Sequence, residues 1–382
     1  MLFSSVVGNV ELQQRLRRLV TDGRMPHASL ILAREGTGGL PMALALASYL
    51  VCENRTDADS CGVCPSCLKS LKAIHPDIYY TFPTIRLEKQ KSPPVSADFL
   101  TEWRSALRTH PYMSVTDWLH TLGDDGKQGN ITTNECHAII KQLSLKSFES
   151  DVKVQVIWMA DYLRENANTL LKVIEEPPAG TYFILVAEQM DQLLPTLISR
   201  TQVFRSVAPE DEELRAYLQK EFPEQAASVV AEEAVRMSDG NVHLASRIVM
   251  GAETGMEESM IQWFHLVRQL AKGPGALDAK SFFGWIDHMD KTGRENQKLF
   301  VDYTLHFIHE SARAYKRYPV LRLSEEEKKL ARTLSNLSRP DVADELLKLL
   351  NHLHMMIERN GHGKTQFVHM SFRMARVLAG QL

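Results

Sequence analysis

The sequence has no segment of the kind that spans a membrane or directs secretion. Its 382 residues contain no run of about 18 apolar residues, roughly the minimum for a transmembrane helix. The first residues, Met1-Leu2-Phe3-Ser4-Ser5, also lack the basic and then apolar order of a signal peptide. We therefore expect a cytoplasmic protein with no membrane partner.

Positive charge is not in excess either. The chain has 44 Lys and Arg against 47 Asp and Glu, a formal net charge of -3. Proteins that hold nucleic acid over a broad surface carry a basic patch that neutralises phosphates. The composition disfavours that class, and any contact with DNA is expected to be shared with partner proteins. A hydrophobic content of 44% and a charged content of 24% are ordinary for a globular chain of this length.

Cysteine is scarce, but its distribution is uneven. Eight, two and two residues separate the four cysteines Cys52, Cys61, Cys64 and Cys67, while Cys136 stands alone and is expected to be a small buried apolar residue. Structural disulfides are disfavoured in a cytosolic chain. Four thiolates at short spacing suit tetrahedral zinc, with an iron–sulfur cluster as the second interpretation. Because four protein ligands leave no open position, the zinc would be structural.

An ATP-binding loop would require residues that this chain lacks. Residues 29–33 read as a buried strand and 41–51 as an apolar helix, and the turn between them contains Gly36, Gly38 and Gly39. This is the layout of a P-loop. Its GxxxxGK[ST] pattern needs a first Gly, a Lys that reaches the phosphates and a hydroxyl residue that binds magnesium.

Those three places hold Ala33, Gly39 and Leu40. Pro41, at the expected start of the helix, has no N–H to offer a phosphate. A lone glycine cluster of this kind is more often an ordinary strand-to-helix turn with no nucleotide ancestry.

A second segment favours the nucleotide interpretation. Residues 153–157 read as another buried strand, and in P-loop ATPases such a strand ends in acidic residues that hold magnesium. Here it ends in Trp158 and Met159. Because both halves of the ATP machinery are missing together, we predict a retired ATPase site that binds no ATP.

Several short motifs follow one another in a recognisable order. They are Phe3–Gly8, Gly23–Ala28, the four cysteines, His75–Asp77, Leu143–Leu145, Leu170–Pro178 and Leu194–Thr201. In this order they resemble the AAA+ clamp-loader subunits of bacterial DNA polymerase III, and within them the delta-prime family. The resemblance runs from residue 3 to about residue 205 and is weaker beyond.

The resemblance implies an α/β AAA+ module, a helix-covered parallel sheet with a zinc knuckle, followed by a small helical lid and an all-α C-terminal collar domain. We expect these parts at residues 1–207, 208–252 and 253–382, with the zinc module at 52–67. The residues alone support this order. Short apolar strands alternate with helices over 131–207, including a helix over 164–174, which predicts parallel β-α units. The chain beyond reads as amphipathic helices.

Residues 83–130 form a longer connection than the resemblance leads us to expect. A helix over 97–109 is predicted within it. Three large aromatic residues in this insertion, Trp103, Tyr112 and Trp118, fit a partner-binding surface or burial within the domain equally well.

The resemblance assigns a role to Ser199-Arg200-Thr201. In clamp loaders a Ser-Arg-Cys motif carries an arginine finger that acts on ATP bound by the neighbouring subunit. This chain keeps the Arg and has Thr in place of Cys. Arg200, with Ser199 beside it, is therefore expected to act in trans, because the fixed planar charge of an Arg stabilises a transferring phosphate. The alternative is a surface Arg at the end of a helix.

These observations predict a non-catalytic delta-prime-like subunit of the DNA polymerase III holoenzyme with structural zinc and no bound ATP. Its expected partners are the gamma/tau ATPase subunits and the delta subunit. Through the assembled complex it would act on the sliding clamp and primed DNA during replication. Two alternatives stay open. One is a divergent but active AAA+ ATPase, and the other is a zinc-bearing DNA-binding adaptor.

Overall fold

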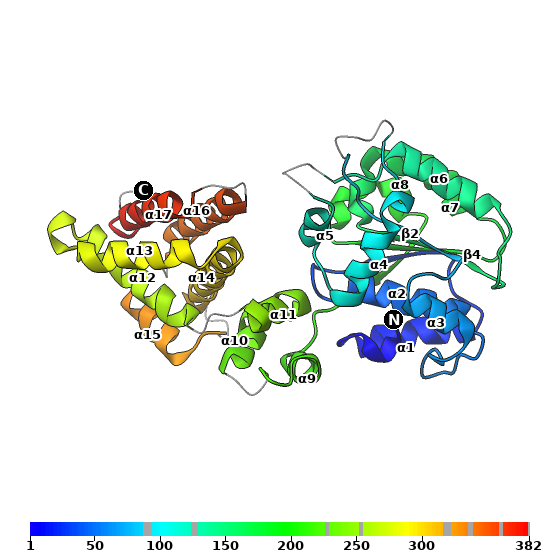
Figure 1. The fold of residues 1–382 in the computed structure, drawn as a ribbon, viewed down its shortest axis with the longest axis horizontal. Coiled ribbons are helices and arrows are strands. Elements are labelled where there is room, and N and C mark those ends of the chain that lie inside the picture. Colours follow the sequence, from blue (N-terminus) through cyan, green and yellow to red (C-terminus); the bar gives the residue numbers. More distant parts are fainter. Residues whose placement is uncertain are drawn as a thin grey trace. The chain divides into compact units, whose positions relative to one another are not determined.

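The structure is a computed structural model that describes residues 1–86, 93–123, 129–225, 229–251, 255–315, 322–334, 339–358 and 362–380. The chain divides into two compact units (Figure 1). The first comprises Met1–Glu221 with Ser238–Leu244, and the second Phe222–Met237 with Ala245–Leu382. None of the helices in these described ranges is long and apolar enough to cross a membrane.

The first unit is built on a five-stranded parallel sheet with strand order β2-β3-β4-β1-β5. The central strands are almost continuously apolar and buried, as expected for a parallel sheet with helices on both faces. In chain order the strands are β1 (Ala28–Leu32), β2 (Ile78–Thr81), β3 (Lys153–Trp158), β4 (Thr181–Ala187) and β5 (Gln202–Arg205).

Helices cover both faces of this sheet (Figure 1). One face carries α1 (Val10–Thr21), α2 (Gly39–Val51), α4 (Leu100–Thr109) and α5 (Val115–Thr121). The other carries α6 (Thr133–Ser144), the 3-10 segment η3 (Ala160–Leu170), α7 (Leu171–Glu175) and α8 (Pro195–Ile198). Short helices α3 (Pro65–Leu71) and α9 (Asp211–Glu221) and the 3-10 turns Phe3–Ser5, Ser96–Phe99 and Met190–Gln192 complete the unit.

The insertion forms part of the core of the first unit. Trp103 and Trp118 are fully buried, and their rings lie 5.2 Å apart, with Phe82 beside both. Tyr112 is also buried. Of the two interpretations of these aromatics, the structure supports burial. Residues 87–92 and 124–128 of the insertion lie outside the described residues.

The second unit is helical. Trp263 and Trp285 stack at its centre with ring centroids 5.3 Å apart, and Phe300 and Phe367 pack against them. Its helices are α10 (Val229–Ser238), α11 (Val242–Gly251), which begins in the first unit, α12 (Met256–Ala271), α13 (Ala279–Lys291), α14 (Arg294–Tyr315), α15 (Glu325–Thr333), α16 (Pro340–Glu358) and α17 (Gly363–Leu378), with a 3-10 turn at Pro274–Ala276.

The predicted fold class, an AAA+ parallel sheet followed by a helical C-terminal part, is confirmed. One expected element differs in type. The helix predicted over 164–174 is mostly 3-10, with Arg164 in a non-helical conformation (φ 48°, ψ −132°), and only α7 is α-helical. The predicted domain limits, 1–207, 208–252 and 253–382, stay a prediction.

Candidate functional sites: a cysteine cluster, a degenerate P-loop and Arg200

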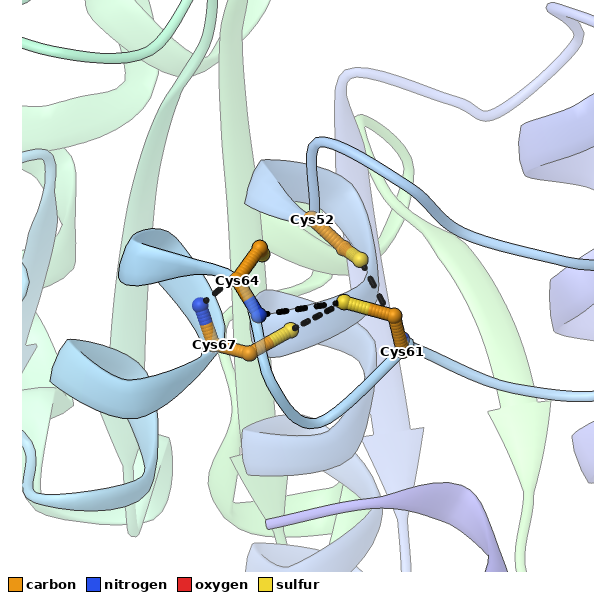
Figure 2. Close-up of side chains that lie close together, drawn as sticks. All are labelled: Cys52, Cys61, Cys64 and Cys67. Atoms are coloured by element: carbon orange, nitrogen blue, oxygen red, sulfur yellow. Dashed lines mark hydrogen bonds between the residues drawn. The ribbon is translucent and has the colours of Figure 1, made fainter.

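The four clustered cysteines converge from the end of α2, the connection that follows it and the start of α3 (Figure 2). Cys52 follows the last residue of α2, Cys64 is the N-cap of α3, and Cys67 lies in its first turn. All four Sγ atoms lie within 4.8 Å of one another. Tetrahedral zinc with bonds of about 2.3 Å would place its sulfur ligands about 3.8 Å apart, so the donor set and its size fit a metal ion.

Backbone amides point at the sulfurs, as a thiolate site requires. The amides of Cys61, Cys64 and Cys67 donate to the sulfurs of Cys52, Cys61 and Cys64 at 3.3, 3.3 and 3.4 Å. Hydrogen bonds from the amides of Val63 and Cys64 lower the pKa of the Cys61 thiol to about 6. Burial raises the pKa of Cys52 and Cys67, which a bound dication would reverse. The residues therefore fit the zinc knuckle.

The P-loop frame is present, but it is too crowded for a lysine side chain. At Gly39, where a P-loop has its Lys, a Cβ atom would lie 2.7 Å from the Ala33 Cβ and 3.0 Å from a Val186 methyl. Gly39 is the first residue of α2, and Pro41 removes a backbone donor from its first turn. Leu40 is buried in the core rather than directed toward a metal ion.

The start of α11 covers this loop. The Val242 amide donates to the Gly36 carbonyl at 2.9 Å, and a Cβ at Gly36 would lie 1.8 Å from the Asn241 Oδ1. Tyr112 of the insertion lines the same space, and its hydroxyl accepts the Val7 amide at 2.8 Å. The remaining cavity is about 20 Å³, close to the space that one water molecule needs.

Acidic side chains stand where phosphates would have to lie. Glu35 and Glu188 both line the small cavity. Burial, together with the nearby charges of Glu35 and Asp161, raises the pKa of Glu188 to about 7. Above that pH the site gathers negative charge, which opposes the binding of a polyphosphate.

The residues at the end of β3 belong to the hydrophobic core rather than to a metal site. Trp158 is buried, with its ring 5.3 Å from that of Trp103. Met159 is also buried, with a positive φ of 57°. Neither side chain offers an oxygen ligand for magnesium. The cysteine cluster is the one group of metal-ligating side chains identified within the described ranges.

Arg200 lies two residues after the short helix α8 and is half-buried. Its Nε donates to the Glu175 carboxylate at 2.7 Å, and its Nη1 donates to the Thr196 carbonyl at 3.1 Å. The Ser199 hydroxyl is also turned back to the Thr196 carbonyl, at 3.1 Å. The guanidinium is therefore held by α7 and α8, and it lies in neither the P-loop cavity nor the cysteine cluster.

Sequence reasoning did not anticipate three residues of these sites. Tyr112 and Asn241 close the P-loop, and Glu175 holds Arg200. Tyr112 and Asn241 are distant from the loop in sequence and carry no spacing signal. Glu175 lies inside the motif Leu170–Pro178, which identified the family but not the role of this carboxylate.

Residues 8–209, more than half of the chain, match the sequence profile of the family described as "DNA polymerase III, delta subunit". The chain belongs to the DNA polymerase III delta-prime family of clamp-loader subunits. The family's delta-prime subunit from Escherichia coli is 27% identical over 243 residues, covering 63% of this chain and 59% of that protein. That from Bacillus subtilis is 28% identical over 249 residues, with 62% of each chain covered.

More distant relatives extend further along the chain. A gamma/tau subunit from Mycobacterium bovis is 23% identical over 318 residues, 78% of this chain and 47% of that protein. A solved gamma subunit-related protein from Thermotoga maritima aligns with 97% of this chain and all of its own, at 13% identity and a TM-score of 0.41. The aligned segments span about 60% of the delta-prime relatives named above.

Proposed function

We propose that this chain is an ATPase-inactive clamp-loader subunit of DNA polymerase III that supplies Arg200 as an arginine finger to a neighbouring gamma/tau ATPase subunit. The crowded position of Gly39 carries the first half of the proposal. A lysine cannot enter there without displacing Ala33 or Val186, and the small cavity beside it, about 20 Å³, disfavours a bound nucleotide. The acidic pair Glu35 and Glu188 further disfavours phosphate.

The position of Arg200 supports the second half. It lies just beyond a short helix of the α/β unit and does not line this chain's own P-loop cavity, which favours action on a nucleotide bound by a neighbour. The Glu175 carboxylate pre-orients the guanidinium through one exposed ion pair. Such an ion pair contributes little free energy, typically about 0 to 1 kcal/mol. A phosphate of the neighbouring subunit can therefore replace the Glu175 carboxylate as the partner of the guanidinium.

The cysteine cluster has a structural role in this proposal. One zinc ion held by Cys52, Cys61, Cys64 and Cys67 would bind the end of α2 to α3 and leave no open coordination position. The delta subunit, the sliding clamp and primed DNA are the further partners that we propose, reached through the assembled complex in the cytoplasm.

The test is the ATPase and clamp-loading activity of the reconstituted complex with Arg200→Ala. We expect normal assembly, with hydrolysis at the adjoining site strongly reduced. Arginine fingers contribute about 10³ to 10⁵ in rate at their own site, although one site of several supplies only part of the total. Arg200→Lys should restore little, since an ammonium lacks the planar fork. Wild-type clamp loading by an assembled Arg200→Ala complex would refute the proposed finger.

A further inference from the structure

An exposed apolar patch lies beside the zinc knuckle. We call it the α3 patch and define it as Leu68, Leu71, Ile74, Leu145 and Phe148. Their exposed fractions are 50, 46, 46, 60 and 81%. The residues come from two segments, and the ion pair between Lys69 and Glu149 (2.5 Å) joins these segments side by side. Contiguous exposed apolar side chains are the usual mark of an interaction surface.

Buried groups hold the second segment rigidly while its apolar side chains face solvent. The fully buried Asp77 carboxylate accepts hydrogen bonds from the backbone amides of Phe148, Glu149 and Ser150, at 2.5, 2.8 and 2.8 Å. The Lys153 ammonium donates to the carbonyls of Leu143 and Leu145. Phe148 is thus displayed from a fixed backbone, which reduces the ordering cost of binding.

The first segment is fixed by the end of α3. The Ile74 amide donates to the Lys69 carbonyl and the Ala73 amide to the Ser70 carbonyl, both at 3.0 Å, with Ala73 at a φ of 51°. This is a Schellman motif with Ala at the left-handed position normally taken by Gly. It fixes the backbone of Ile74, which is 46% exposed.

The two segments that carry the patch are basic. Residues 65–74 and 141–151 contain Lys69, Lys72, Lys141 and Lys146 against Glu149 and Asp151. Lys69 is neutralised by Glu149, whereas no ion-pair partner is found among the described residues for the other three lysines, which are all exposed. A second copy of this chain would bring like charges together across a two-fold interface, which disfavours self-association through the patch.

We propose that the α3 patch docks a partner protein segment whose apolar face is edged by Asp and Glu side chains. Leu, Ile and Phe side chains supply the apolar contact, and Lys72, Lys141 and Lys146 select the acidic edge. Four of the five patch residues are aliphatic and offer no ring for base stacking, so a protein is favoured over single-stranded nucleic acid.

Two synthetic amphipathic helical peptides of about 18 residues provide the probes. They share one leucine stripe, which one peptide flanks with Glu and the other with Lys. In fluorescence anisotropy with the full chain, we expect the acidic peptide to bind at least about tenfold more tightly than the basic one. Phe148→Ala should weaken that binding about tenfold. Lys72→Glu with Lys146→Glu should abolish or reverse the preference.

Phe283→Ala and Lys272→Glu are the matched controls, since both residues are exposed in the helical unit, and they should change nothing. Leu71→Ala replaces Phe148→Ala if that variant loses its circular dichroism or zinc content. Equal binding of the two peptides, or unchanged binding by a folded patch variant, would overturn the proposal. Displacement of the acidic peptide by a single-stranded oligonucleotide would instead assign the patch to nucleic acid.

Discussion

The crowding at Gly39 predicts that replacing this helical glycine with alanine will lower the stability of the protein, the opposite of the usual effect. Gly39 begins a helix at a negative φ, so Ala at this position would ordinarily be neutral or slightly stabilising. Here the new methyl would lie 2.7 Å from the Ala33 Cβ and 3.0 Å from Val186, both attached to rigid backbone in the sheet layer. Overpacking of this kind costs about 1 to 3 kcal/mol. Gly39→Ala should therefore destabilise the α/β unit by about 1 to 2 kcal/mol.

Gly284→Ala provides the matched control. Gly284 lies inside α13, with nothing within 4 Å of an added Cβ, so Ala should stabilise its unit by about 0.5 to 1 kcal/mol. Urea unfolding followed by tryptophan fluorescence and circular dichroism measures both variants. If Gly39→Ala stabilises its unit as much as Gly284→Ala does, the loop has room for a side chain. The steric argument for an inactive site would then be wrong.

The same crowding predicts that restored consensus residues will not restore nucleotide binding. Gly39→Lys with Leu40→Thr returns the lysine and hydroxyl of a P-loop, yet Asn241 and Tyr112 still occupy the space above it. In isothermal titration neither the wild type nor this variant should bind ATP at millimolar concentration. Magnesium-dependent binding of ATP in the micromolar range by the wild type would contradict the proposed inactive site directly.

Three further predictions concern other groups. Elemental analysis should find one zinc ion per chain in the wild type and in Cys136→Ala, and none in Cys61→Ser. The affinity for zinc should fall in acid, because the thiolates become protonated. A zinc-to-protein ratio near zero in the wild type would exclude the zinc knuckle. Glu188 has a folded pKa of about 7, above its ordinary value of 4.5, so its ionisation opposes folding as pH rises from 4.5 to 7. Glu188→Gln should therefore stabilise more at pH 8 than at pH 5, by at most about 3 kcal/mol in urea unfolding, and an equal effect at both pH values would disprove the shift. Glu175→Gln should change stability by less than about 1 kcal/mol and keep the ATPase stimulation assigned to Arg200, whereas a loss equal to that of Arg200→Ala would make Glu175 essential rather than orienting.

Local pattern was enough to predict most of the fold. The strand predicted at 153–157 appears as β3 (Lys153–Trp158), and the chain after the sheet is helical, as its amphipathic pattern predicts. Apolar periodicity and cap residues involve only neighbouring residues, so they can be recognised from the sequence alone. The pattern failed at 164–174, where a kink at Arg164 converts an amphipathic segment into 3-10 turns.

The cysteine spacing and the missing P-loop residues were determined by the sequence itself, because ligand number and residue type are chemical facts that need no fold. Only the tertiary structure decided which side chains lie against the P-loop. Tyr112 comes from the insertion, more than 70 residues after Gly38 in the sequence. Asn241 immediately precedes α11, more than 200 residues after Gly36. Burial of the insertion's aromatics and the partner of Arg200 were decided in the same way. Contacts between residues so far apart depend on how the layers pack, and no local pattern encodes that packing.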